Sequence, residues 1–415
     1  MNNFFLNKAE LSGYKSIENT SIEFNNGLNL IIGKNAAGKT NFLNFLNKSL
    51  NFDFSNFNNF KVNFSIKKNG ISYVFDFTKK TTIKLKKKDT NTFVSLKRLN
   101  PEFNGKLEIR GENTGINGVF EINNEEDISK FSDILENEPA LFKSTLIRHG
   151  LPKNYLIIDK PLNIEIINKS ISDDFFNYYN SSDQSKFFKK LLFSLINIDI
   201  IEGKYFNNKL RKRESIENFT RDKIKLYKNK ISKDLSFLDD LKQVLQDNSP
   251  IENVRMNDNF LIEIDNEEKK ISVKNFFLEY QIDERWHTFD DLSDGTKRIF
   301  YLISEIFTLD MNFEEKILNV IFIEEPELGI HPHQLYKLMR FIKEKSRTNQ
   351  ILVTTHSPLT LDVLEETELD SIIIAEIRDG VTNLKNLNNT KIEKAKAYME
   401  ELNLSDFWLN SDLED

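Results

Sequence analysis

The chain has 415 residues, of which 29% are charged and 39% hydrophobic; at about 100–200 residues per domain, this length allows two or three domains. Its 57 Lys and Arg against 64 Asp and Glu give a net charge of −7, which argues against a uniformly basic nucleic-acid-binding protein but not against a local basic patch. The chain has no cysteine, which excludes disulfides, cysteine–zinc sites and thiol catalysis and favours the reducing cytoplasm.

Neither of the usual membrane signals is present in the sequence. The first residues contain no basic segment followed by an apolar stretch, so we expect no signal peptide. No apolar run approaches the roughly 18–20 residues that span a bilayer. We therefore expect a cytoplasmic protein without a membrane-spanning segment.

Two short strands, residues 22–24 and 28–32, are predicted around an Asn-Asn-Gly turn. The second is almost continuously apolar, as buried strands are, and it leads directly into residues 33–40, which follow the pattern G-x-x-x-x-G-K-T. Apolar residues at helical spacing come next. The pattern therefore lies between a strand and a helix, which is the context of a phosphate-binding P-loop.

The residue types in this segment suit a nucleotide with its Mg²⁺. Gly33 and Gly38 allow backbone conformations in which N–H groups surround phosphate oxygens, and the positive end of the following helix points at the same place. We expect Lys39 to reach the β- and γ-phosphates and the Thr40 hydroxyl to bind Mg²⁺. The predicted binding set for ATP is Gly33, Lys34, Asn35, Ala36, Ala37, Gly38, Lys39, Thr40 and Asn41.

Residues from about 50 to 125 alternate between apolar and polar, as at 61–66 and 71–77, which predicts an antiparallel sheet. A further alternating segment, 81–88, carries a cluster of lysines. Such a cluster could hold DNA phosphates, although a solvent-exposed edge strand is the more frequent explanation. The cluster consists of Lys84, Lys86, Lys87 and Lys88.

From about 126 to 257 the pattern turns mainly helical. Residues 184–200 are strongly apolar, and 213–246 combine charges with apolar residues at helical spacing, which predicts an amphipathic helix with one break. A helix of that length spans only about 51 Å at 1.5 Å per residue, so we expect a compact helical insertion for dimerisation or partner docking. The adjacent basic residues 211–213 could contact phosphate or begin a solvated helix.

Residues 258–287 alternate again and lead into a helix that begins near Ser293, Asp294 and Gly295. A serine in that place is an ordinary helix N-cap, but a Ser-Asp-Gly helix start can also bind an anion. On these residues alone both interpretations stay open.

Two more buried strands are predicted at 318–323 and 350–355. The first ends in consecutive carboxylates, of which Glu324 is placed to support Mg²⁺ and Glu325 to polarise an attacking water. The second ends at His356, whose imidazole could contact the γ-phosphate and sense its presence. Alone, these features would indicate a solvated acidic turn and a structural histidine; together with the P-loop they indicate a nucleotide site.

The order of these motifs resembles the head of an ABC-type ATPase of the RecF/SMC-like and OLD-like branch. Residues 11–17, 324–332 and 355–358 carry the likeness to this branch, which covers roughly 1–48 and 285–410. The resemblance implies an α/β P-loop head with a mixed sheet, an antiparallel β lobe and a helical insertion. The expected parts are an N-terminal ATPase lobe (1–125), a mainly helical insertion (126–257) and a C-terminal ATPase lobe (258–415).

The resemblance also implies roles for single residues on one copy of the chain. Lys39, Glu325 and His356 would be catalytic, with Lys39 on phosphate, Glu325 as general base or water-positioning residue, and His356 as the γ-phosphate switch. Thr40 and Glu324 would bind or support Mg²⁺. ATP and Mg²⁺ are thus the expected cofactors.

A second copy of the chain is implied as well. Ser293 and Gly295 would contact the γ-phosphate bound by the other copy, so that ATP joins two heads and hydrolysis releases them. Lys15 is a further candidate phosphate contact. Two features depart from the pattern of these heads: Asp294 stands where glycine is commoner, and the usual glutamine after the P-loop helix is missing, since none precedes Gln184.

The final residues predict a helix near 359–366, a strand at 371–377 and a helix near 390–402. OLD-like nucleases carry an additional TOPRIM domain, for which the 57 residues after Pro358 (415 minus 358) leave no room. We therefore expect that this chain is not itself such a nuclease.

Three functions are compatible with these residues. We favour an ATPase whose nucleotide-driven dimerisation switches a separate nuclease or toxin, as the sensor of a bacterial antiphage system similar to PARIS or Septu. The second is a RecF-like DNA-repair ATPase, which would bind DNA with a steep salt dependence; the net negative charge weighs against it. The third is a regulator that does not bind DNA, or a transporter-like subunit.

Overall fold

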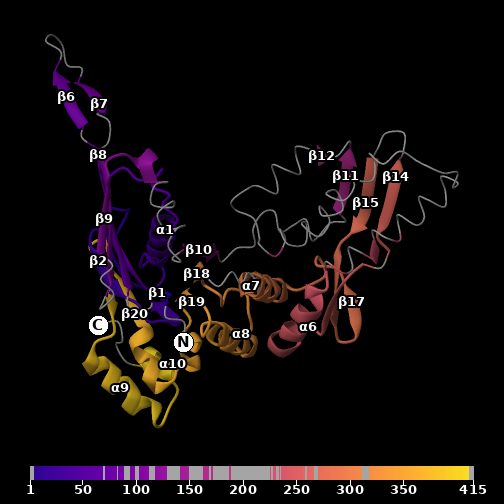
Figure 1. Cartoon of the computed structure of the whole chain (residues 1–415). Coiled ribbons are helices and arrows are strands. Elements are labelled where there is room, and N and C mark those ends of the chain that lie inside the picture. The colour runs from indigo at the N-terminus through magenta and orange to yellow at the C-terminus, as the bar shows by residue number, and fades with distance from the viewer. Residues whose placement is uncertain are drawn as a thin grey trace. The chain divides into compact units, whose positions relative to one another are not determined.

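The computed structural model divides the chain into two compact units (Figure 1). Unit 1 comprises Met1–His149, Phe313–Leu328 and Met339–Asp415, and unit 2 comprises Gly150–Asn312 and Gly329–Leu338. The structure describes residues 4–68, 71–81, 83–87, 94–98, 102–111, 117–128, 141–148, 162–167, 170–171, 187, 225, 228–229, 233, 235–257, 259–265, 270–310 and 317–410.

The central sheet of unit 1 has, within the described residues, the strand order β10-β18-β19-β3-β20-β21. Neighbouring strands from β10 to β20 are parallel, and β21 is antiparallel to β20. Strands β3 and β19 are buried at every residue, which explains the apolar residues that make up most of β3 and the middle of β19. The bounds are β3 Leu28–Ile32, β10 Leu141–Ile147, β18 Ile317–Glu324, β19 Gln350–Thr355, β20 Ile372–Arg378 and β21 Val381–Asn386.

An antiparallel sheet forms the second layer of unit 1, with the order β2-β1-β4-β5-β8-β9 among the described strands. The antiparallel sheet predicted for residues 50–125 is thereby confirmed. Burial alternates along β5, so one face of this sheet packs on a core. The bounds are β1 Phe4–Ser12, β2 Thr20–Glu23, β4 Phe60–Lys68, β5 Ile71–Lys80, β8 Glu102–Gly111 and β9 Asn117–Ile122.

Helix α1 (Lys39–Leu50) shares one hydrophobic core with both sheets. Phe42 and Leu46 of α1 lie in the same buried cluster as Phe64 of the antiparallel sheet and Phe322 of the central sheet. Because the helix begins directly after the P-loop, the packing of its apolar face holds the loop against the end of β3. The α/β fold class predicted from the sequence is confirmed.

A side chain joins the two sheets of unit 1. The amide of Gln350, which is 1% exposed, accepts a hydrogen bond from Leu6 N at 2.7 Å and donates to Leu6 O at 2.8 Å and Asn25 O at 3.0 Å. The pairing of β1 with β4 shifts register just after Leu6, and the side chain of Gln350 bonds both backbone groups of Leu6 beside this irregularity.

The remaining elements of the first 128 residues are short. β6 (Ile83–Lys87) pairs with β7 (Val94–Arg98), so a strand forms within predicted segment 81–88. The structure does not describe the lysine side chains of β6, and Lys88 as a whole lies outside the described residues. A 3-10 helix, η1 (Glu125–Ile128), is tied to β5 by the ion pair between Lys79 and Glu125 at 2.6 Å.

Unit 2 combines small sheets with helices in its described part. One sheet has the order β12-β11-β15-β14 and another the order β13-β16-β17. An aromatic cluster that includes Phe187, Tyr280, Phe289 and Phe300 packs beside them. The bounds are β11 Leu162–Ile167, β12 Ser170–Ile171, β13 Asn253–Met256, β14 Leu261–Asp265, β15 Lys270–Phe276, β16 Leu278–Ile282, β17 Arg285–His287, α6 Phe237–Asn248 and α7 Asp294–Asp310.

The range 126–257, predicted to be mainly helical, is only partly described. Helix α6 lies inside the amphipathic segment 213–246, but β10, β11, β12 and β13 are strands, so the helical prediction is wrong at these residues. Strand β10 pairs with β18, and such pairing outweighs local helical periodicity. Residues 188–200 and 211–213 lie outside the described residues, and the insertion's boundaries stay a prediction.

The C-terminal part of unit 1 differs from the prediction at one element. Instead of one helix near 359–366, two 3-10 helices form, η3 (Pro358–Val363) and η4 (Glu366–Ser371). Leu364 and Glu365 between them are extended, and Glu365 and Glu368 form a capping box that begins η4. Helices α8 (Pro332–Lys345), α9 (Asn389–Met399) and α10 (Leu404–Asn410) complete the described elements.

Within the described residues, no helix is long and apolar enough to cross a bilayer.

Substituting Gln350 by alanine is expected to lower the free energy of unfolding by about 2–4 kcal/mol, since the buried backbone groups of Leu6 lose their partners. Urea denaturation measures this loss. The exposed Gln243 of α6 provides the control, because Gln243→Ala should change the stability by less than about 0.5 kcal/mol. Equal effects of the two substitutions would contradict a linking role for Gln350.

Candidate nucleotide-binding site

The P-loop connects β3 to α1 and lies against the hairpin of β20 and β21. A Cβ atom added at Gly33 would lie 2.2 Å from the carbonyl oxygen of Ala375. One added at Gly38 would lie 2.0 Å from Thr382 Oγ1, and Gly38 has a φ of +90°. Both positions therefore require glycine, since real side chains never approach other atoms so closely.

Lys39 begins α1 and folds back across the loop. Its side chain is buried, with the residue 4% exposed, and its ammonium donates to the carbonyl oxygens of Gly33 at 2.7 Å and Lys34 at 3.0 Å. The remaining loop positions are more open, since Lys34, Asn35 and Ala36 are exposed. Thr40 is exposed at the first turn of α1, where its hydroxyl can reach a ligand, while Ala37 is buried and donates its N–H to Lys34 O.

A hydrogen-bonded network brings Lys15 to the same place. Lys15 Nζ donates to Asn41 Oδ1 at 3.0 Å, and Asn41 Nδ2 donates to Ser16 Oγ at 3.2 Å. Thr382 donates to Ser16 through both its hydroxyl and its backbone N–H, each at 2.7 Å. Lys15 is thus held beside the residue that follows Thr40, and its contact with phosphate stays a prediction.

The carboxyl ends of β18 and β19 carry the other predicted residues of unit 1. Glu324 is the last residue of β18 and is 1% exposed. Glu325 has a φ of +45°, and its N–H donates to Thr354 O at 2.9 Å. A non-glycine residue in this left-handed conformation is uncommon and often marks a functional position. Because β18, β19 and β3 are parallel neighbours, their carboxyl ends lie at one edge of the sheet.

His356 follows β19 and lies between two carboxylates. Its Nδ1 is 3.1 Å from Glu327 Oε1 and 3.9 Å from Glu325 Oε1. Glu327 was not among the predicted site residues, although it is the third carboxylate of the Glu-Glu-Pro-Glu segment. The sequence signal was therefore present, but a glutamate after a proline in an acidic turn is also typical of a solvated loop.

The helix start at Ser293, Asp294 and Gly295 belongs to unit 2. Ser293 Oγ accepts a hydrogen bond from Thr296 N at 3.2 Å, so the N-cap interpretation is confirmed. Ser293 is exposed, whereas Gly295 is buried, and a Cβ added there would lie 2.5 Å from the carbonyl oxygen of Gly329. Contact of Ser293 and Gly295 with a nucleotide of a second copy stays a prediction. Gln184 lies outside the described residues.

The described residues contain no group of three or more histidine or acidic side chains able to hold a metal alone. In P-loop proteins, nucleotide phosphates and water supply most of the Mg²⁺ ligands. Exposed Thr40 and Glu324 at a strand end provide the hydroxyl and carboxylate chemistry such a site needs.

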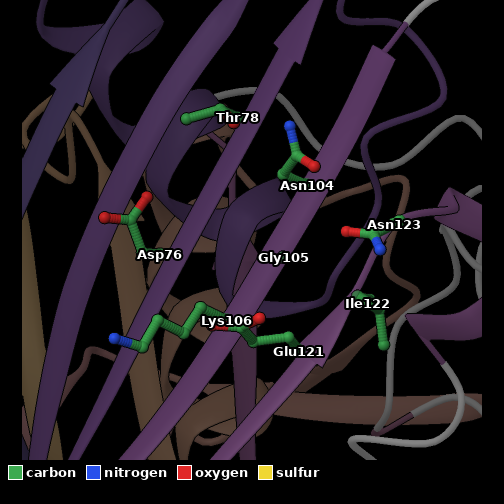
Figure 2. A pocket seen from close by; sticks show the side chains of 8 residues that line it. All are labelled: Asp76, Thr78, Asn104, Gly105, Lys106, Glu121, Ile122 and Asn123. Carbon is green, nitrogen blue, oxygen red and sulfur yellow. The ribbon is translucent and has the colours of Figure 1, made fainter.

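A pocket of about 250 Å³ lies elsewhere in unit 1, on β5, β8 and β9 (Figure 2). Lys106 is the register partner of both Asp76 and Glu121, so positive and negative side chains alternate across it. None of the predicted site residues lines this pocket. Its lining consists of Asp76, Thr78, Asn104, Gly105, Lys106, Glu121, Ile122 and Asn123.

A buried lysine in a glycine loop between strand and helix, with carboxylates at the end of a parallel strand of the same sheet, defines a P-loop nucleotide-binding fold. Residues 28–362 match the family model described as "AAA domain, putative AbiEii toxin, Type IV TA system". The chain belongs to this AAA-domain family. No curated protein matches the chain.

Among solved structures, the chain is similar to heads of SMC proteins. A Smc head bound to the C-terminal winged-helix domain of ScpA has 14% identity and a TM-score of 0.45, over 94% of this chain and 99% of that one. A Smc head from Pyrococcus furiosus has 15% identity and a TM-score of 0.45, over 96% and 100%. The Thermotoga maritima SMC head has 13% identity and a TM-score of 0.38, over 92% and 99%.

The Gly38→Ala variant is expected to lose nucleotide binding and to unfold at lower urea than Gly380→Ala. Both glycines have positive φ, +90° and +80°, but nothing lies within 4 Å of a Cβ at Gly380. Gly380→Ala should therefore cost only the left-handed penalty of about 1–2 kcal/mol, and Gly38→Ala that penalty plus the clash with Thr382. Equal losses would show that Thr382 moves aside freely.

Proposed function

We propose that this protein binds and hydrolyses ATP in a site completed by a second copy of itself. The observation that carries this proposal is the arrangement of Lys39, Glu325 and His356 at the carboxyl ends of three neighbouring parallel strands. Ligands of open α/β sheets bind at that edge. The P-loop supplies phosphate binding, and the other two side chains supply chemistry.

Each group of unit 1 has a defined task in this proposal. The backbone N–H groups of the P-loop and the start of α1 surround the phosphates, and Lys39 exchanges its contacts with Gly33 and Lys34 for phosphate oxygens. Thr40 and Glu324 hold Mg²⁺, directly or through water. Mg²⁺ would neutralise charge on the phosphates.

Hydrolysis needs a water aligned with the γ-phosphate. The left-handed backbone of Glu325 directs the chain away from β18, and its side chain remains 23% exposed. A carboxylate that is partly accessible at this edge can accept a hydrogen bond from the attacking water. His356, whose Nδ1 lies 3.9 Å from Glu325 Oε1, is placed to respond to the γ-phosphate.

The second copy would contribute Ser293 and the start of α7. Helix α7 runs from Asp294 to Asp310, and its N-terminal N–H groups favour an anion. Ser293 is exposed next to them. ATP bound by one copy would thereby attract the helix start of the other, in a head-to-tail homodimer or a larger homo-oligomer.

We propose further that this dimerisation switches a partner effector, a nuclease or toxin, in a bacterial antiphage system in the cytoplasm. Support for a defence-related role comes from the family description, which associates this AAA domain with a putative toxin of a type IV TA system. The alternative is a RecF-like ATPase that binds DNA directly, for which the lysines of β6 are the candidate contacts. An affinity for DNA that falls steeply with salt would favour the alternative.

Glu325→Gln is expected to bind ATP and accumulate as an ATP-bound dimer or larger assembly, because binding is kept while water activation is lost. Sedimentation velocity with and without ATP and Mg²⁺ measures this. Lys39→Ala is the matched control and should neither bind ATP nor change its sedimentation. A Glu325→Gln protein that binds ATP but sediments identically with and without it would refute the shared site.

Co-expression with the protein encoded beside it tests the effector role. The partner's nuclease or toxic activity should differ between the wild-type chain and Glu325→Gln, because the two populate different nucleotide states. An ATPase that is active in vitro and leaves every such partner unchanged would contradict the role as a switch.

A further inference from the structure

Glu327 is the most enclosed acidic side chain beside His356. Its side chain is 7% exposed, against 23% for Glu325. Its Oε1 accepts hydrogen bonds from Thr355 Oγ1 and from His356 N, both at 2.8 Å. The carboxylate is therefore attached to the last residue of β19 and to the backbone of the histidine itself.

The chain path explains how Glu327 reaches this place. Glu325 takes the left-handed conformation immediately after β18, and Leu328 N donates to Glu325 O at 3.4 Å. The resulting turn reverses the chain over residues 325–328. The carboxylate of Glu327 thereby returns to the end of β19, while that of Glu325 stays more accessible.

Two buried polar atoms at this point have no hydrogen-bond partner among the described residues. They are His356 Nδ1 and Glu327 Oε2. His356 Nδ1 lies 3.1 Å from the other oxygen of the same carboxylate, Oε1, which already accepts two hydrogen bonds. A proton on Nδ1 and a small rotation of either group would satisfy both atoms, and buried groups left unsatisfied are unfavourable.

We propose that Glu327 is the positioning residue of His356, a proposal that rests on the ATP-hydrolysing site described above. Glu327 holds the Nδ1–H of His356, which leaves Nε2 as the nitrogen available on the nucleotide side. A carboxylate behind an imidazole fixes both its orientation and its tautomer. Glu325 Oε1 lies farther from the same nitrogen, at 3.9 Å, so the carboxylate of Glu325 remains free to orient the attacking water.

The three glutamates of this segment would then act differently although they are chemically identical. Glu324 ends the strand, Glu325 faces the reacting water, and Glu327 acts only through His356. Glu327 touches neither nucleotide nor Mg²⁺ in this scheme. Its loss should therefore change the rate of hydrolysis rather than the affinity for ATP.

A double-mutant cycle tests the proposal, with Glu327→Gln, His356→Ala, the double variant and Glu344→Gln as control. The amide introduced by Glu327→Gln keeps an oxygen for Thr355 and for His356 N, so the fold should survive. Glu327→Gln should lower kcat on the order of tenfold, as loss of a histidine's carboxylate partner does, with KM and ATP affinity nearly unchanged. In the His356→Ala background the same substitution should cost less than about twofold. The exposed Glu344 should have no effect.

Multiplicative losses in the double variant, or a fall in ATP affinity equal to the fall in kcat, would overturn the proposal. Selective ¹⁵N labelling of histidine gives a readout that does not need hydrolysis. The signal of His356 is identified because it is missing from the spectrum of His356→Ala. In the wild type, His356 should carry its proton on Nδ1, and in Glu327→Gln this preference for Nδ1 should be lost. If Nδ1 of His356 carries no proton in the wild-type protein, the pairing with Glu327 is overturned. If Nδ1 carries the expected proton but the wild-type protein hydrolyses no ATP, only the proposed function is overturned.

Discussion

The backbone of the P-loop lies so close to the hairpin of β20 and β21 that no side chain fits between them. Gly33 meets Ala375 and Gly38 meets Thr382, residues more than 300 positions later in the chain. The loop's shape therefore depends on the C-terminal hairpin as much as on its own glycines. Two predicted groups of the site are bonded to residues of this contact: Lys39 donates to Gly33, and the network that holds Lys15 ends at Thr382.

Contiguous motifs were predictable because their chemistry and their local structure are set by the same few residues. The P-loop, with Lys39 buried at the start of α1, and the strands that end at Glu324 and just before His356 follow directly from pattern and spacing. Contacts between distant segments could not be predicted in this way, since nothing in the local sequence distinguishes Gln350 as the partner of Leu6. The same holds for Thr382 and the turn that carries Lys15.

Helical periodicity was a weaker guide in the middle of the chain. Strand β10 forms because β18 offers it a parallel partner, and β18 lies far away in sequence. Glu327 shows the related difficulty at the site. An acidic residue after proline suggests solvent, and only the return of the chain to β19 shows that it is enclosed by Thr355 and His356.

Unit 1 is assembled from three separate stretches of the chain, with unit 2 inserted between them. Strand β3 emerges early from the ribosome, but its neighbours β19 and β20 end at Thr355 and Arg378. At a synthesis rate of about 5–20 residues per second, this buried strand waits on the order of 20–70 s for its partners. A mostly apolar strand without neighbours is prone to aggregate, so chaperones that hold nascent chains become relevant to this protein's yield in cells.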